Sequence, residues 1–107
     1  MAEVADWVRV ASVEDCPPGK LLGVEADGQQ IVLANVEGSF YALLDRCTHQ
    51  DYPLSDGELD GTRVECLYHG ARYDVRTGRA VQLPAIRPVK TFEVEVRGDD
   101  VYIRTGQ

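Results

Sequence analysis

The stretch CTHQDYPLSDGELDGTRVECLYHG, residues 47–70, decides how this chain is interpreted. Cys47 and His49 open the stretch, and Cys66 and His69 stand near its end. Sixteen residues separate the two pairs, and the whole 107-residue chain contains 2 histidines and 3 cysteines. Thiolates and imidazoles are ligands that transition metals prefer. We therefore expect two loops that each present one sulfur and one nitrogen to a shared metal centre.

Two cysteines with two histidines suit a two-iron cluster, and the same set also suits a structural zinc ion. Zinc folds usually space their ligands C-x2–4-C and H-x3–5-H. The spacings here are C-x-H and C-x2-H, which favour the cluster over zinc. The third cysteine, Cys16, has no histidine nearby. We interpret Cys16 as a small buried core residue rather than a ligand.

The sequence around both pairs resembles the Rieske family. After the first pair comes LSDG at 54–57, which is similar to the first cluster loop of that family. After the second pair come Gly70, YD at 73–74 and TG at 77–78, which are similar to the second loop. LPA at 83–85 resembles the proline loop that covers the cluster from a third side. The match in these motifs extends well beyond the ligands.

The resemblance implies one [2Fe–2S] cluster, with Cys47 and Cys66 on one iron and His49 and His69 on the other. Neutral imidazoles in place of two thiolates remove negative charge and make reduction easier. The potential then rises from roughly −400 mV to between about −150 and +300 mV. The added electron is expected on the histidine-bound iron, so the histidines are the expected exit for electrons.

Two of three features that the resemblance associates with high-potential members are missing, which places the expected potential at the lower end of that range. High-potential members carry a disulfide between the loops, and the corresponding residues here are Tyr52 and Tyr68. Those members also carry a serine that donates to a bridging sulfide, and here that residue is Ala71. Tyr73 matches a family tyrosine, which implies that it either donates to the Cys47 sulfur or simply packs in the core.

The remaining sequence predicts an all-β chain. Gly- and Pro-containing turns, such as Asp27-Gly28 and Glu37-Gly38, separate short runs that are rich in β-branched residues. This pattern is typical of an antiparallel β-sandwich or partial barrel, and the resemblance makes it the Rieske fold. We expect one domain, 1–107, with a cluster-binding subdomain at about 46–84 and a helical turn near Pro53–Ser55. The expected strands are Trp7–Ala11, Leu21–Ala26, Gln30–Val36, Phe40–Asp45, Arg63–Leu67, Arg72–Val75, Thr91–Arg97 and Val101–Arg104.

The composition excludes several functions. The formal net charge of −7 disfavours nucleic-acid binding, because nucleic-acid backbones are negative. The same negative charge either keeps the protein soluble or attracts it electrostatically to a basic partner. No apolar run approaches the ~20 residues that span a bilayer, so we expect no membrane association. The first ten residues lack the pattern of a signal peptide, and we expect a cytoplasmic location.

The resemblance implies a soluble, monomeric one-electron carrier that takes electrons from a flavin-dependent reductase and passes them to a terminal oxygenase. The alternative is a small fixed subunit of a redox complex, such as a nitrite reductase, or part of an iron–sulfur assembly system. Oxygenase activity of the chain itself is not expected. A mononuclear iron needs two more histidines, and both histidines are already assigned to the cluster.

Overall fold

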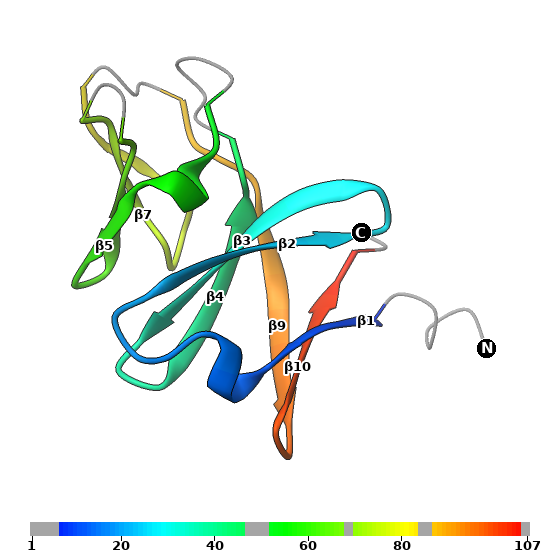
Figure 1. Ribbon diagram of the computed structural model, residues 1–107. Coiled ribbons are helices and arrows are strands. Elements are labelled where there is room, and N and C mark those ends of the chain that lie inside the picture. Colours follow the sequence, from blue (N-terminus) through cyan, green and yellow to red (C-terminus); the bar gives the residue numbers. More distant parts are fainter. Residues whose placement is uncertain (1–6, 47–51, 68–69, 84–86, 106–107) are drawn as a thin grey trace.

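A computed structural model describes residues 7–46, 52–67, 70–83 and 87–105. Within these residues, two antiparallel sheets make up the fold (Figure 1). The larger sheet has the strand order β1-β10-β9-β4-β3-β2, and the smaller one has the order β5-β6-β7-β8. The larger sheet consists of β1 (Trp7–Ser12), β2 (Leu21–Ala26), β3 (Gln29–Val36), β4 (Ser39–Leu44), β9 (Thr91–Arg97) and β10 (Asp100–Arg104).

The larger sheet curls into an incomplete barrel. Its two outer strands, β1 and β2, contact each other, although they do not neighbour each other in the hydrogen-bonded order of the described strands. β2 and β3 are joined by a tight turn in which Asp27 and Gly28 both have positive φ angles, 55° and 78°. Two successive positive φ values are typical of the type I′ turn that suits a two-residue hairpin. The predicted hairpin turn at Asp27-Gly28 is therefore confirmed.

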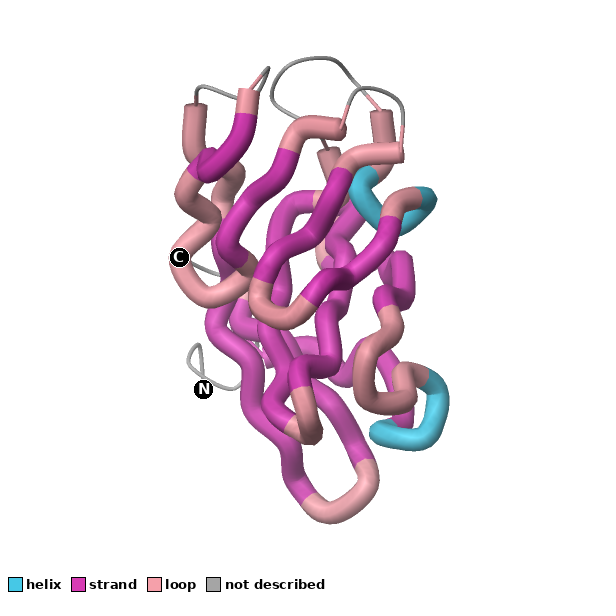
Figure 2. Tube along the Cα trace, turned by 90° about the vertical axis from the view of Figure 1, so that its left-hand side faces the viewer, coloured by secondary structure: helices cyan, strands magenta, loops and turns pink. Residues whose placement is uncertain are grey.

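The smaller sheet lies toward one end of the molecule, opposite the β9–β10 hairpin (Figures 1 and 2). Its strands are short: β5 (Glu58–Asp60), β6 (Arg63–Glu65), β7 (Arg72–Asp74) and β8 (Ala80–Gln82). Two short 3-10 helices complete the described structure, η1 (Val13–Asp15) and η2 (Leu54–Asp56). None of the helices in the described part of the chain has the length and hydrophobicity needed to cross a membrane.

The two faces of strand β3 contribute side chains to two different hydrophobic cores. Ile31 and Leu33 point into the barrel core, whereas Val32 and Ala34 point into the core under the smaller sheet. All four side chains are fully buried, because successive residues of a strand face opposite sides. The unbroken apolar run in β3 thus couples the smaller sheet to the barrel.

The all-β prediction is confirmed, with differences at several boundaries. The predicted strand Phe40–Asp45 ends at Leu44, because Asp45 turns its carboxylate toward Ser55. The predicted strand Arg63–Leu67 ends at Glu65, because Cys66 begins a turn whose ends are hydrogen-bonded. The predicted helical turn is present as η2, shifted by one residue. Strands β5 and β8 and the helix η1 were not expected from the sequence.

Candidate metal centre

Cys66 is the predicted ligand that the structure describes, and it lies at the end of β6. Its side chain is buried, with 1% of its surface exposed. The Cys66 amide donates to the Ala71 carbonyl over 2.7 Å, and the Gly70 amide donates to the Cys66 carbonyl over 3.1 Å. These two bonds close a turn from 66 to 71. The other predicted ligands, Cys47, His49 and His69, lie outside the described residues.

The segment that contains Cys47 and His49 in sequence is closed at its base by two hydrogen bonds between Asp45 and Ser55. The Ser55 amide donates to Asp45 Oδ1 over 2.7 Å, and the Ser55 hydroxyl donates to Asp45 Oδ2 over 2.6 Å. Next to Ser55, Leu54 is fully buried in the same core as Cys66. Both ends of the 46–54 segment are therefore fixed to the body of the protein.

A third segment, 79–88, is also closed at its base, here by backbone atoms. The Val89 amide donates to the Gly78 carbonyl over 2.8 Å. Gly78 has a φ of +79°, and a Cβ at this position would overlap the Val89 carbonyl oxygen. Glycine is therefore required both by the backbone conformation and by the close approach. This segment contains the predicted proline loop, 83–85, of which residues 84 and 85 lie outside the described residues.

The first and second segments meet at Gly57. A Cβ at Gly57 would overlap the carbonyl oxygen of Glu65, the residue before Cys66. The chain that leaves the first segment therefore lies directly on the strand that leads to the second. A small pocket beside this contact is lined by Gly57, Glu58, Glu65, Cys66 and Leu67.

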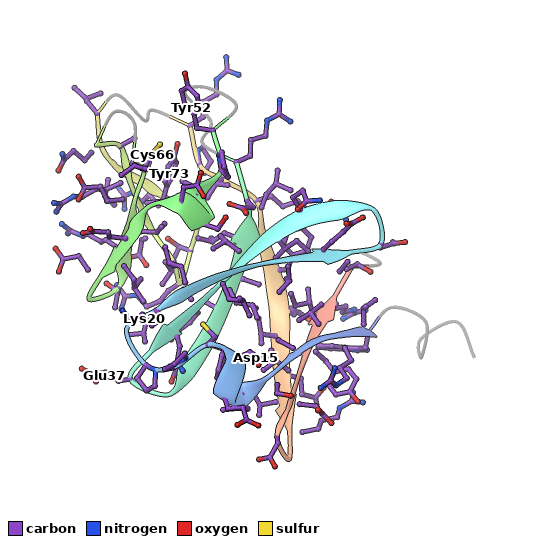
Figure 3. The ribbon with its side chains drawn as sticks, in the orientation of Figure 1. Asp15, Lys20, Glu37, Tyr52, Cys66 and Tyr73 are labelled. Atoms are coloured by element: carbon purple, nitrogen blue, oxygen red, sulfur yellow. The ribbon has the colours of Figure 1, made fainter. Side chains whose placement is uncertain are left out.

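Tyr73 and Ala71 pack in the same hydrophobic core as Cys66. Both side chains are fully buried, and both belong to the same core cluster as Cys66. Figure 3 shows Tyr52, Cys66 and Tyr73 close to the smaller sheet, away from Asp15 at the far side of the barrel. The hydrogen bond expected from Tyr73 to the Cys47 sulfur stays a prediction, because Cys47 lies outside the described residues.

Cys16 lies in a different environment from Cys66. It belongs to the barrel core, and its side chain is fully buried. The Cys16 thiol donates to the Lys20 carbonyl over 3.4 Å. Burial raises the pKa of this thiol above its usual 9.0, so it stays protonated at neutral pH. Cys16 therefore packs in the barrel core, in a different cluster from Cys66, as expected for a core residue.

The donor chemistry suits an iron–sulfur cluster. Cys66 supplies a buried sulfur at the start of the closed 66–71 turn, which also contains His69 in sequence, and Leu54 at the end of the first segment lies in the same core cluster as Cys66. No group of three or more His, Cys, Asp or Glu residues is placed to hold a metal within the described ranges, which contain one of the four predicted ligands. Two thiolates and two imidazoles are the ligand set of a Rieske cluster.

Comparison with known proteins gives the same result. The family model of the Rieske [2Fe–2S] domain matches residues 6–93. The ferredoxin component of biphenyl 2,3-dioxygenase from Rhodococcus jostii is 43% identical over 95 residues, which cover 89% of each chain. The solved ferredoxin of carbazole 1,9a-dioxygenase from Nocardioides aromaticivorans superposes with a TM-score of 0.90 at 31% identity, over 92% of this chain and 97% of that one.

A second solved structure is a complex of reduced oxygenase and oxidized ferredoxin in carbazole 1,9a-dioxygenase. One of its chains matches with a TM-score of 0.88 at 37% identity, over 94% of each chain.

The chain belongs to the Rieske [2Fe–2S] family. Within that family it is a ferredoxin of ring-hydroxylating dioxygenase systems, so it carries electrons to an oxygenase and is not the catalytic subunit. The predicted family, fold, cofactor and electron-carrier function are thereby confirmed.

Proposed function

We propose that Cys47, His49, Cys66 and His69 hold the cluster and that this end of the molecule docks on the terminal oxygenase. The single observation that carries the proposal is the position of Cys66. Its sulfur is buried, whereas the next side chain, Leu67, is 59% exposed. A partner that touches Leu67 would therefore come within one residue of a cluster ligand, as electron transfer requires.

A second exposed leucine extends the same surface. Leu83 is 73% exposed and directly follows β8, which pairs with β7 beside the 66–71 turn. The Gln82 side chain donates to the Gly70 carbonyl over 3.2 Å, so the end of β8 is attached to that turn. We name these two exposed apolar side chains, Leu67 and Leu83, the docking edge. Weak redox encounters bury less than about 1,200 Å² in total, which suits so small an apolar surface.

Charge favours a transient encounter. The net charge of −7 steers the protein toward a basic face on a partner, and this attraction is screened by salt. A flavin-dependent reductase would load the electron at the same edge, and a monomeric carrier can serve both partners in turn. We propose the cytoplasm as the place of this exchange, because its reducing conditions suit a free buried cysteine such as Cys16.

The test measures electron transfer from the reduced protein to the terminal oxygenase of a biphenyl dioxygenase by stopped-flow absorbance. Leu67→Ser and Leu83→Ser should each lower the second-order rate several-fold and leave the midpoint potential unchanged. The matched control is Val96→Ser, which removes an exposed apolar side chain from β9, away from the smaller sheet. Equal effects of all three substitutions would contradict docking at this edge.

Two further measurements separate the carrier from a fixed subunit. The rate should fall as salt rises, and the protein should elute as a monomer in gel filtration. A stable complex with the oxygenase at high salt would support the fixed-subunit alternative instead.

A further inference from the structure

The two hydrogen bonds between Asp45 and Ser55 join residues ten positions apart. The hydroxyl–carboxylate distance of 2.6 Å is in the range of a strong, charge-assisted hydrogen bond. The second bond uses the other carboxylate oxygen and the Ser55 amide at 2.7 Å. Asp45 stands two residues before Cys47, and the chain between the bonded residues contains both Cys47 and His49. The pair therefore closes the segment that carries half of the proposed ligand set.

Each partner of this pair is itself fixed to the barrel. The Asp45 amide donates to the Gln30 carbonyl of β3 over 2.9 Å. Leu54, next to Ser55, is fully buried beside Cys66 in one core cluster. A Cβ on Gly23 of β2 would lie 3.0 Å from Ser55 Oγ and 3.3 Å from Asp45 Oδ2. The pair thus lies directly against the backbone of β2.

The first segment, 46–54, is closed by bonds that involve side chains, whereas the other two segments are closed by backbone bonds. The 66–71 turn and the 79–88 segment are closed at their bases by bonds between backbone atoms. Such bonds need no particular side chain as donor or acceptor. Both bonds of the first segment end on the Asp45 carboxylate, and one of them also requires the Ser55 hydroxyl, so this closure depends on the identity of two residues.

We propose that Asp45 and Ser55 are positioning residues that hold the first cluster-binding segment closed and thereby slow the loss of the cluster. The inference rests on the proposed ligand set, which includes Cys47 and His49. Opening of the 45–55 pair would remove the direct link between the two ends of the segment, and its two ligands would then leave the iron more readily. Closure makes such release rare without any contact between the pair and the metal.

The test is the first-order rate at which the visible absorbance of the purified holoprotein bleaches in excess chelator, well below its unfolding temperature. Ser55→Ala removes the hydroxyl bond and should speed bleaching roughly tenfold, the effect of one lost hydrogen bond to a charged group. Asp45→Ala removes both acceptors and should have a larger effect. Asp45→Asn keeps one acceptor for the amide and offers an NH₂ donor to the hydroxyl, so it should stay within about twofold of wild type.

A steric variant and matched controls separate closure from general stability. Gly23→Ala changes no hydrogen-bonding group and crowds Ser55 Oγ, so it should also speed bleaching. Two controls remove analogous bonds at η1: Asp15→Ala removes the acceptor of the bond that the Ser12 amide donates over 3.0 Å, and Ser12→Ala removes the hydroxyl that accepts from Arg9 over 3.0 Å. These two controls should lower the melting temperature and leave the bleaching rate near wild type.

The bleaching rates test the closure by Asp45 and Ser55, whereas the spectra test the ligand set. Wild-type bleaching in Ser55→Ala would overturn the proposal, as would an equal acceleration in the η1 controls. If Asp45→Ala fails to fold, the comparison of Ser55→Ala with Asp45→Asn still decides, because rescue by asparagine requires geometric closure. Failure of the ligand set would look different: His49→Cys would then leave the visible and EPR spectra unchanged, whatever the bleaching rates.

Discussion

Gly57→Ala should be strongly destabilising, although it adds a single methyl group. Gly57 has φ −88° and ψ −152°, an extended conformation that alanine also adopts, so backbone strain contributes little. The obstacle is steric. The new Cβ would overlap the Glu65 carbonyl oxygen, and it would lie 3.0 Å from the Glu65 carbonyl carbon and 3.2 Å from the Leu54 carbonyl oxygen. The chain leaving the first segment would have to move away from the strand that leads to Cys66.

The magnitude follows from the nature of the obstacle. Overpacking typically costs about 1–3 kcal/mol, and the upper end applies here because backbone atoms cannot rotate away, so we expect about 3 kcal/mol. For a domain of this size, each kcal/mol lowers the melting temperature by about 4–8 °C, so the expected loss is about 12–24 °C. The methyl group also separates the first two segments, so the cluster should be lost early in the transition.

The assay is thermal melting of the holoprotein, followed by far-UV circular dichroism and by the visible absorbance of the cluster. The matched control is Gly61→Ala, at the opposite end of the same β5–β6 hairpin. Gly61 has φ +61°, and a Cβ added there would have nothing within 4 Å, so alanine should cost about 1 kcal/mol from the left-handed backbone alone. Equal melting temperatures for the two variants would refute the close approach of Gly57 to Glu65.

Three further predictions concern individual side chains. Cys16→Ala should lower the melting temperature and leave the cluster spectrum intact, because Cys16 packs in the barrel core; loss of the visible spectrum would make it a ligand. Ala71→Ser should raise the midpoint potential in voltammetry, because a hydroxyl donor stabilises the charge of the reduced cluster, and an unchanged potential would count against this account of tuning. The hydrogen bond from Arg76 lowers the pKa of Asp74, so this pair stabilises the fold above the usual carboxyl pKa of 3.8 and the benefit is lost as pH falls through the lowered value. Arg76→Gln should therefore reduce the melting temperature at pH 7, and the difference from wild type should vanish in acid.

The elements that sequence analysis predicted are those with strong local signals. Strand β3 carries a long run of β-branched and apolar residues, and the turn before it has the Asp-Gly pair of a type I′ hairpin. The ligand positions were predicted because their spacing is itself the signal. Each of these features lies within a short window of sequence.

The features that were missed depend on distant partners or very short windows. β5 and β8 have three residues each, too few for alternation to be recognised, and tertiary pairing with β6 and β7 forms them. The helix η1 did have a signal, because Ser12 and Asp15 have the spacing of a capping box. The Asp45–Ser55 pair gives no such signal, since bonding across ten residues follows from the tertiary fold.

The central claim is tested most directly by pulsed EPR of the reduced protein after labelling with ¹⁵N-histidine. The chain contains 2 histidines, so every ¹⁵N coupling must come from His49 or His69. We predict two strongly coupled nitrogens on a [2Fe–2S] cluster, and loss of one in each of the single His→Cys variants. A spectrum with no coupled ¹⁵N, or with a single one, would contradict the assignment of both histidines as cluster ligands.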